Sequence, residues 1–297
     1  MNMTVSVRVM SAGDGYKYLL KTVAAADGDR SLSTPLTRYY AEAGTPPGRW
    51  LGAGVAALGD GELSVGDRVS EAQLQLLIGM GRDPITGNPL GLAFPNYKTE
   101  AERIESRIAA LDPSLSPGGK GEAVAQIVAE ETARGARRAV AGFDFTFSIP
   151  KSASVLWAVA DAGVQALIGE AHHRAVAEVV AFMEREVAAT RTGATAGDGA
   201  VAQVDVTGLI ATAFDHFDSR AGDPHLHTHV VISNKAKTAF DDKWRSLDGR
   251  PMHAAVVAWI APGSVESGLC RPGGCRGAGV FSVEQVFVLD GWDVAAV

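Results

Sequence analysis

Alternation of apolar and polar residues predicts the strands of this chain. Residues 143–149 place three phenylalanines on one face and three polar side chains on the other, the pattern of a half-buried strand. The polar side chains are Asp144, Thr146 and Ser148. Further strands are predicted at residues 3–10, 201–217 and 226–234, the last two joined by a turn at 218–224 that is rich in Asp, Ser, Gly and Pro.

Helical periodicity predicts most of the remaining structure. A capping-box spacing at residues 70–73 begins a helix that ends near Gly81. Other helices are expected at residues 16–26, 100–111, 122–138 and 164–191, with a linker at 112–121. His172 and His173 lie inside the last of these, where we expect solvated or partly packed side chains.

These elements predict an α+β fold. We expect a central antiparallel sheet with the hairpin of residues 201–234 at its centre and helices packed on one face. A chain of 297 residues accommodates one large domain, or one domain with an appendage.

Composition narrows the class of protein. The apolar share is 46%, and no run approaches the ~20 apolar residues of a membrane span, so no membrane insertion is expected. The first residues lack a secretory signal and the only cysteines are Cys270 and Cys275, which favours a cytoplasmic protein. A net charge of -7 argues against tight nonspecific binding to duplex DNA, so any nucleic-acid site must be local.

The histidines supply the first candidate chemistry. His225, His227 and His229 alternate along one predicted strand and therefore share a face, and His216 can meet them across the hairpin. Converging imidazoles form a site for a divalent metal and leave coordination positions for substrate or water. The alternative of unrelated surface or core histidines fits this spacing poorly.

The same residues carry a resemblance to a family. The stretch FDHFDSRAGDPHLHTHVVISN resembles the histidine motif of TrwC-like (MobF) conjugative relaxases, within the HUH endonuclease superfamily. The resemblance implies that His216, His227 and His229 are the metal ligands, with His225 a neighbour or bystander. It implies Mg²⁺ or Mn²⁺ as the ion, and imidazole-rich sites also suit Zn²⁺ or Ni²⁺.

Two further segments resemble the family. FDFTFSIPKSAS matches its strand-to-helix segment, and its aspartate falls on Asp144, which would orient a ligand histidine and help remove a tyrosine proton. The alternative is a strand-end aspartate satisfied by backbone or solvent. The segments SAGDGYKYLL and YYAEAGTPPGRWLGAGVAALG resemble the tyrosine clusters and the W-x-G-x-G segment. Ungapped alignment puts the nucleophile at Tyr18, with Tyr16 close by, whereas Tyr39 and Tyr40 serve either a second strand transfer or aromatic packing.

The resemblance implies a reaction and its partner. The expected activity is site- and strand-specific nicking of single-stranded DNA at a plasmid transfer origin through a 5'-phosphotyrosyl intermediate, with other relaxosome proteins as further partners. Each candidate DNA contact could equally be an ordinary surface residue. The candidates are Arg137, Arg138, Lys151, Arg220, Lys243, Trp244 and Arg245.

The end of the chain departs from the family pattern. We expect residues 1–258 to form the relaxase domain and residues 259–297 to be an atypical tail, frameshifted or disordered. No G-x-x-x-x-G-K-[ST] motif is present, so no nucleotide cofactor is expected. Two alternatives stay open: a truncated, catalytically inactive DNA-binding remnant, and a metal-dependent phosphodiesterase that uses activated water.

Overall fold

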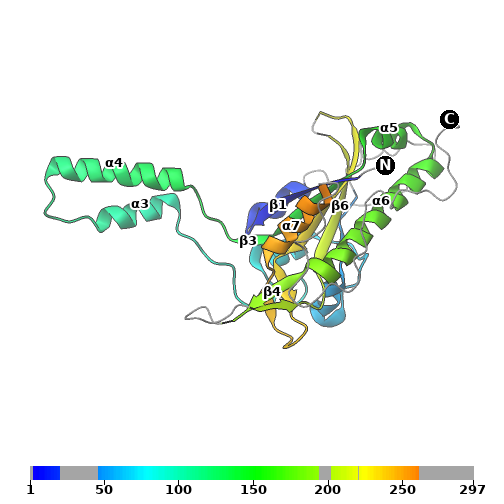
Figure 1. The fold of residues 1–297 in the computed structure, drawn as a ribbon, viewed down its shortest axis with the longest axis horizontal. Coiled ribbons are helices and arrows are strands. Elements are labelled where there is room, and N and C mark those ends of the chain that lie inside the picture. The colour runs from blue at the N-terminus through cyan, green and yellow to red at the C-terminus, as the bar shows by residue number, and fades with distance from the viewer. Residues whose placement is uncertain (1–2, 21–45, 194–201, 220, 261–297) are drawn as a thin grey trace. The chain divides into compact units, whose positions relative to one another are not determined.

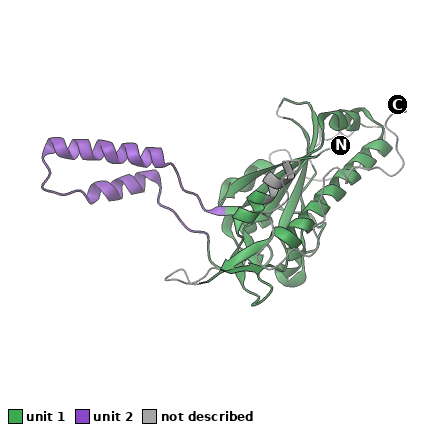
Figure 2. Ribbon diagram, viewed as in Figure 1, with its two compact units in different colours: residues 1–93, 141–297 green, residues 94–140 purple. Residues whose placement is uncertain are grey.

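The computed structural model describes residues 3–20, 46–193, 202–219 and 221–260. The chain divides into two compact units (Figure 2), one of residues 1–93 with 141–297 and one of residues 94–140. Tyr39, Tyr40, Arg220, the two cysteines and residues 261–297 lie outside the described ranges. None of the described helices is long and apolar enough to cross a membrane.

A five-stranded sheet organises the larger unit (Figure 1), with strand order β1-β3-β7-β6-β2. The central strand β7 pairs antiparallel with β3 and β6, and β6 pairs antiparallel with β2. The strand bounds are β1 Thr4–Ser11, β2 Arg49–Leu51, β3 Val140–Ser148, β6 Ala211–Asp218 and β7 Pro224–Ser233. The expected α+β fold with a histidine hairpin at the centre of an antiparallel sheet is confirmed.

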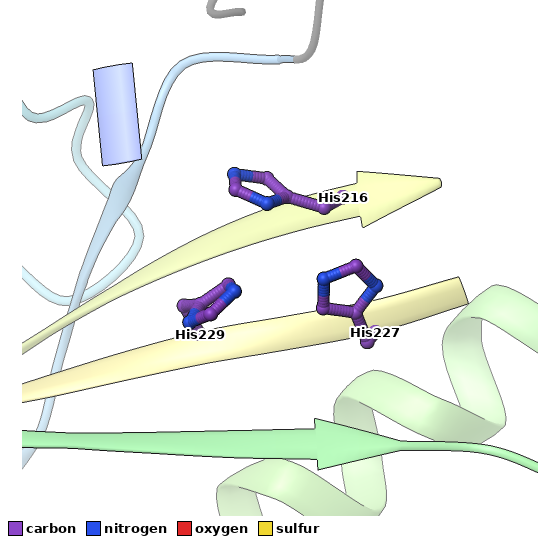
Figure 3. A group of neighbouring side chains, drawn as sticks. All are labelled: His216, His227 and His229. Carbon is purple, nitrogen blue, oxygen red and sulfur yellow. The ribbon is translucent and has the colours of Figure 1, made fainter. Parts of the chain in front are cut away.

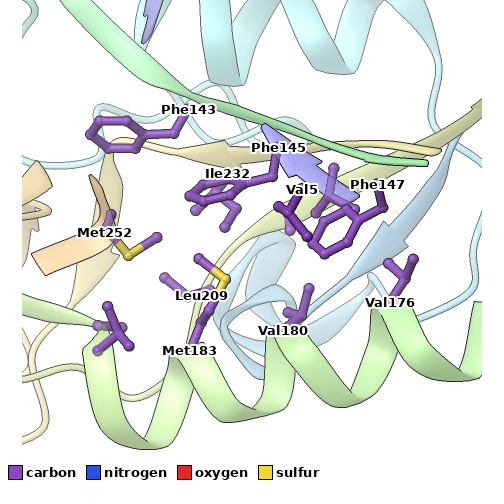
Figure 4. Packing of buried hydrophobic residues seen from close by; sticks show 14 of the residues in the cluster. Val5, Phe143, Phe145, Phe147, Val176, Val180, Met183, Leu209, Ile232 and Met252 are labelled. Atoms are coloured by element: carbon purple, nitrogen blue, oxygen red, sulfur yellow. The ribbon is translucent and has the colours of Figure 1, made fainter. Parts of the chain in front are cut away.

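The apolar face of the sheet packs against helices. The side chains of Phe145 and Phe147 point from β3 toward helix α6, Ala162–Phe182 (Figure 4), and the Phe143 ring lies against His253, 5.7 Å between ring centroids. Met252 of helix α7, Gly249–Ile260, joins the same core. Burial of each large side chain of this kind contributes roughly 1.5–3 kcal/mol, so this layer holds the sheet against α6.

Short elements complete this unit. Two small antiparallel ribbons pair β4, Ala189–Thr192, with β5, Ala202–Asp205, and β8, Lys235–Lys237, with β9, Trp244–Ser246. The remaining short elements are η1 Asp14–Leu20, η2 Ala53–Ala57, η3 Gly59–Gly61, α2 Glu71–Leu74, η4 Gln75–Gly79 and α5 Lys151–Val159.

The W-x-G-x-G segment has a steric explanation. Gly52 has φ +93°, and a Cβ there would lie 2.3 Å from the carbonyl oxygen of Leu209. The next glycine of the motif, Gly54, donates its N–H to that carbonyl at 3.0 Å. Glycine at these positions therefore lets the chain leaving β2 pass directly against the segment that enters β6.

The smaller unit is a pair of helices, α3 Glu100–Ala109 and α4 Pro117–Arg134. Glu131 is buried between them and accepts from Arg103 Nε at 2.6 Å and from Arg107 Nη1 at 3.0 Å. Thr99 begins α3 with a capping box and Ser116 caps α4. The predicted linker was therefore wrong over residues 117–121, because Ser116 followed by Pro117 is a helix start that the glycines after it concealed.

Other element boundaries differ from the prediction for local reasons. The expected strand 201–217 is two strands, β5 and β6. The expected helix 16–26 begins instead as the 3₁₀ helix η1, and its residues 21–26 lie outside the described ranges. The helix predicted to reach residue 191 ends at Phe182, passes through a π turn, Met183–Val187, and enters β4. Helix α5 was missed because it directly follows the strand-ending Pro150.

Candidate active site

The β6–β7 hairpin brings three histidines together. His216 lies directly opposite His227 in the register, and His229 follows on the same face of β7. Ring centroids are separated by 5.3 Å for His216 and His227, 4.9 Å for His216 and His229, and 5.2 Å for His227 and His229. One nitrogen from each ring lies within 4.8 Å of the others, and the three side chains gather above the two strands, with their rings edge-on or tilted to one another (Figure 3).

Each ring has one nitrogen occupied elsewhere. His227 Nδ1 is 2.8 Å from the carbonyl oxygen of His225, and His229 Nδ1 is 3.0 Å from both carboxylate oxygens of Asp144. The backbone of Leu19 hydrogen-bonds to His216, whose buried Nε2 has no partner among the residues that the structure describes. An orphaned imidazole nitrogen facing two further imidazoles fits a metal ion, because oriented neutral rings are the ligand form that divalent ions bind.

Burial keeps His216 and His227 neutral. It lowers the pKa of His216 to about 4, with the neighbouring His229 adding to the effect. Burial also lowers the pKa of His227 to about 4. Both rings are therefore unprotonated at neutral pH and available as ligands.

Tyr18 joins the cluster through Asp144. Its hydroxyl donates to Asp144 Oδ2, and its ring meets the His229 ring edge-on at 5.9 Å. Burial, reinforced by the charge of Asp144, raises the pKa of Tyr18, and the charge of Arg8 acts in the opposite direction. The phenol is thus protonated at neutral pH, and the group that can take its proton is already hydrogen-bonded to it.

Tyr16 occupies a different environment. Its side chain is 2% exposed, and burial raises the pKa of its hydroxyl. Both tyrosines lie in η1, where a 3₁₀ helix turns about 120° per residue, so side chains two apart cannot share a face. The structure therefore brings Tyr18, rather than Tyr16, to Asp144.

The predicted DNA contacts lie in separate places. Lys151 Nζ is 3.0 Å from the carbonyl of Pro224, at the start of β7. Lys243 is exposed, and Arg245 forms a two-point ion pair with Asp241 at 2.7 Å for both oxygens. Trp244 and Arg245 line a cavity whose lining contains none of the three clustered histidines. Within the smaller unit, the Arg137 guanidinium stacks 4.5 Å above Tyr97, and Arg138 is exposed.

A second polar cluster was not recognised in the sequence. Asp215 faces Thr228 across the β6–β7 register and accepts from its hydroxyl at 2.6 Å. It also accepts from Arg49 at 2.6 Å and lies 3.0 Å from His173 Nε2. His172 Nε2 is 2.8 Å from the Thr228 hydroxyl.

The expectation for His172 was wrong, because its side chain is 0% exposed. Thr228 lies between His227 and His229, so alternation places it on the opposite, helix-covered face of the sheet. The sequence held one sign of this buried cluster. Asp215 and Thr228 are polar residues at strand positions that should face the core. The cluster indicates that a hydrogen-bonded network supports the hairpin from behind the three clustered histidines.

Known proteins resemble this chain in sequence. Residues 12–261 match the sequence model of the TrwC relaxase family. Two relatives carry the description multifunctional conjugation protein TraI. The protein from Escherichia coli is 37% identical over 106 residues, and that from Escherichia coli strain K12 is 34% identical over 113 residues. These matches cover 36% and 38% of this chain but 6% of each relative.

Solved structures resemble it in fold. A copper-bound conjugative relaxase TrwC in complex with oriT DNA matches with a TM-score of 0.52 at 24% identity, over 86% of this chain and 65% of that one. A metal-bound TrwC complex with oriT DNA gives a TM-score of 0.51 at 22% identity, with the same coverage. This chain therefore spans a small part of the curated relatives and about two thirds of the solved chains.

Proposed function

This chain belongs to the TrwC relaxase family, and from that membership we propose that it cuts one strand of DNA at a plasmid transfer origin. The observation that supports this activity best is the chain of contacts from the Tyr18 hydroxyl through Asp144 to His229, beside His216 and His227. The proposed nucleophile, proton acceptor and metal-binding residues are thus in contact with one another. The substrate is proposed to be single-stranded DNA, and other relaxosome proteins are proposed as partners.

His216, His227 and His229 would hold a divalent ion through one imidazole nitrogen each. When bound, such an ion would polarise the nonbridging oxygens of the scissile phosphate. Asp144 holds His229 from its far side, which fixes the ring that faces the phosphate.

Tyr18 is the proposed nucleophile. Its oxygen attacks phosphorus while its proton passes to Asp144, the P–O3' bond breaks, and the leaving 3'-oxygen takes a proton from water to become the 3'-hydroxyl. One phosphodiester bond is exchanged for another, so the 5'-phosphotyrosyl product conserves the bond for religation. The charge of Arg8 favours the phenolate during this step, a role that the sequence pattern did not suggest.

A trapping experiment tests the proposal. The protein is incubated with single-stranded oligonucleotides carrying candidate transfer-origin sequences and Mn²⁺ or Mg²⁺, and the products are separated under denaturing conditions. We expect a covalent protein–DNA adduct that is lost with EDTA and in Tyr18→Phe. Tyr16→Phe is the matched control and should retain the adduct, because Tyr16 is buried away from Asp144.

The other outcomes identify the alternatives. Strand cleavage without an adduct would contradict a tyrosine nucleophile and favour the phosphodiesterase that uses activated water. DNA binding with neither cleavage nor adduct would favour the inactive remnant.

A further inference from the structure

A second site lies at the far end of the strand that carries the histidines. A cavity of about 360 Å³ is lined by Leu92, Arg191, Lys235, Trp244, Arg245, Ser246 and Leu247. We call it the Lys235 cavity. Its volume is at the lower end of the range for small-ligand sites, roughly 300–1,000 Å³. Among the described residues its lining contains three cations and no carboxylate.

Lys235 gives the cavity its chemical character. Its side chain is 2% exposed, burial lowers its pKa, and its ammonium donates to the carbonyl of Leu92. A bound anion would stabilise this ammonium, and Arg191, which reaches the same cavity from β4, adds a second positive charge.

The wall of the cavity that Leu92 and β9 form is fixed in place. Gly91 has φ +73°, and a Cβ there would lie 2.5 Å from the carbonyl oxygen of Trp244. The backbone before Leu92 therefore lies directly against β9, so only glycine fits at this contact. Asp241 and Asp248 lie beyond the lining and pair with Arg245 and Arg191, which holds both guanidinium groups in position.

The position of the cavity relates it to the histidines. Lys235 follows His229 by six residues, which span at most ~22 Å of extended chain. At the ~3.4 Å rise of a stacked strand this distance corresponds to about six nucleotides. About six stacked nucleotides are therefore long enough to span the distance between the histidines and the cavity.

We propose that the Lys235 cavity binds one nucleotide of the DNA strand, within about six nucleotides of the scissile phosphate, with its phosphate at Lys235 and Arg191 and its base against Trp244. This inference rests on the proposed function, because it takes single-stranded DNA as the substrate. Cation and indole together match the two parts of a nucleotide, the phosphate and the base.

The test measures affinity as a function of oligonucleotide length. Binding of labelled oligonucleotides to Tyr18→Phe protein, which cannot cleave, is compared for strands that end two nucleotides from the nick and strands that extend beyond six. In that background, Trp244→Ala and Arg191→Gln should each weaken binding of the long strands by about fivefold or more and leave the short strands unaffected.

Arg250→Gln is the matched control, because Arg250 also pairs with Asp248 but does not line the cavity. It should bind both strands as the unsubstituted protein does. Lys235→Met keeps the length of the side chain without its charge and should repeat the long-strand loss. The thermal midpoint of Lys235→Met is measured as well. If this variant fails to fold, Trp244→Ala and Arg191→Gln decide the question.

The inference would be overturned if Trp244→Ala and Arg191→Gln bound the long strands as tightly as the Tyr18→Phe protein without these substitutions. Competition by a free mononucleotide at millimolar concentration, without any dependence on strand length, would also overturn it, because the cavity would then bind a free nucleotide. The covalent adduct is measured separately on a short strand. Its absence would count against the proposed chemistry while the length dependence still tests the cavity.

Discussion

The carboxylate of Asp144 links the two halves of the candidate active site. Its Oδ2 accepts from the Tyr18 hydroxyl, and both its oxygens lie 3.0 Å from His229 Nδ1. It is fully buried and projects from β3, the strand beside β7. One residue therefore orients the His229 ring and also contacts the hydroxyl of the proposed nucleophile, Tyr18.

Replacing Asp144 with asparagine tests this double role. The amide retains the shape of the side chain but cannot take the phenolic proton, so the rate of adduct formation should fall by about 10²–10⁴-fold. The control is Thr146→Val, which removes another polar neighbour of His229 Nδ1, at 3.2 Å, without removing a base, and should cost much less. Adduct formation by Asp144→Asn at the rate of the unsubstituted protein would rule out Asp144 as the proton acceptor.

His172 should make stability depend on pH. Burial lowers its pKa to about 4, whereas the unfolded chain takes up this proton near the ordinary value of 6.5. The contribution of the neutral His172 ring to the free energy of unfolding is therefore fully present above pH 6.5. As the pH falls from 6.5 to about 4, the free energy of unfolding should decrease by about 3 kcal/mol.

Urea unfolding at several pH values, with EDTA present, measures the effect. His172→Gln keeps a donor for Thr228 without a titrating group, so its free energy of unfolding should fall less steeply over this range. His216 and His227 retain their own dependence, so the slope is reduced and not abolished. An unchanged slope in the variant would contradict the assignment.

Among the helices and strands, the sequence pattern predicted those features that depend on neighbouring residues in the chain. The alternation in β3 and β7 was correctly identified, because burial of one sheet face imposes a period of two. The end of α6 was not, because a π turn and a small ribbon depend on tertiary pairing with β5. Within the site, the three histidines were predictable, whereas the burial of His172 depends on Thr228, 56 residues away.

The network behind the hairpin should contribute strongly to stability. Asp215 is buried and accepts from Arg49 and Thr228, so Asp215→Ala leaves a partly buried guanidinium and a hydroxyl without their acceptor. We expect the free energy of unfolding to fall by about 3 kcal/mol.

Asp14→Ala is the matched control. The pair of Asp14 with Lys17 has a similar distance, 2.8 Å, but is exposed and screened by solvent, so its loss should cost much less than the loss of Asp215. Chemical denaturation of the two variants gives both values. Equal losses would mean that the Asp215 network does not hold the hairpin.

Two properties of the whole molecule do not follow from the sequence pattern: its division into units and the local grouping of its positive charges. The helix pair of residues 94–140 forms a compact unit of its own, although its elements lie within the predicted domain of residues 1–258. That domain boundary stays a prediction. The net charge of -7 is compatible with DNA as substrate only where cations gather locally, and the Lys235 cavity is one such place.

Metal binding should stabilise the folded chain as a whole, because the three ligands converge only when β6 and β7 are paired. An ion at 100 times its Kd adds about 2.7 kcal/mol, which thermal unfolding detects readily. Three imidazoles favour transition ions over Mg²⁺, which prefers oxygen ligands, so Zn²⁺ or Ni²⁺ should raise the midpoint more than Mn²⁺, and Mn²⁺ more than Mg²⁺.

His216→Ala should abolish the shift, whereas His225→Gln should preserve it, because His225 is outside the cluster. A shift of equal size for Mg²⁺ and Mn²⁺, or one that persists in His216→Ala, would place the ion elsewhere.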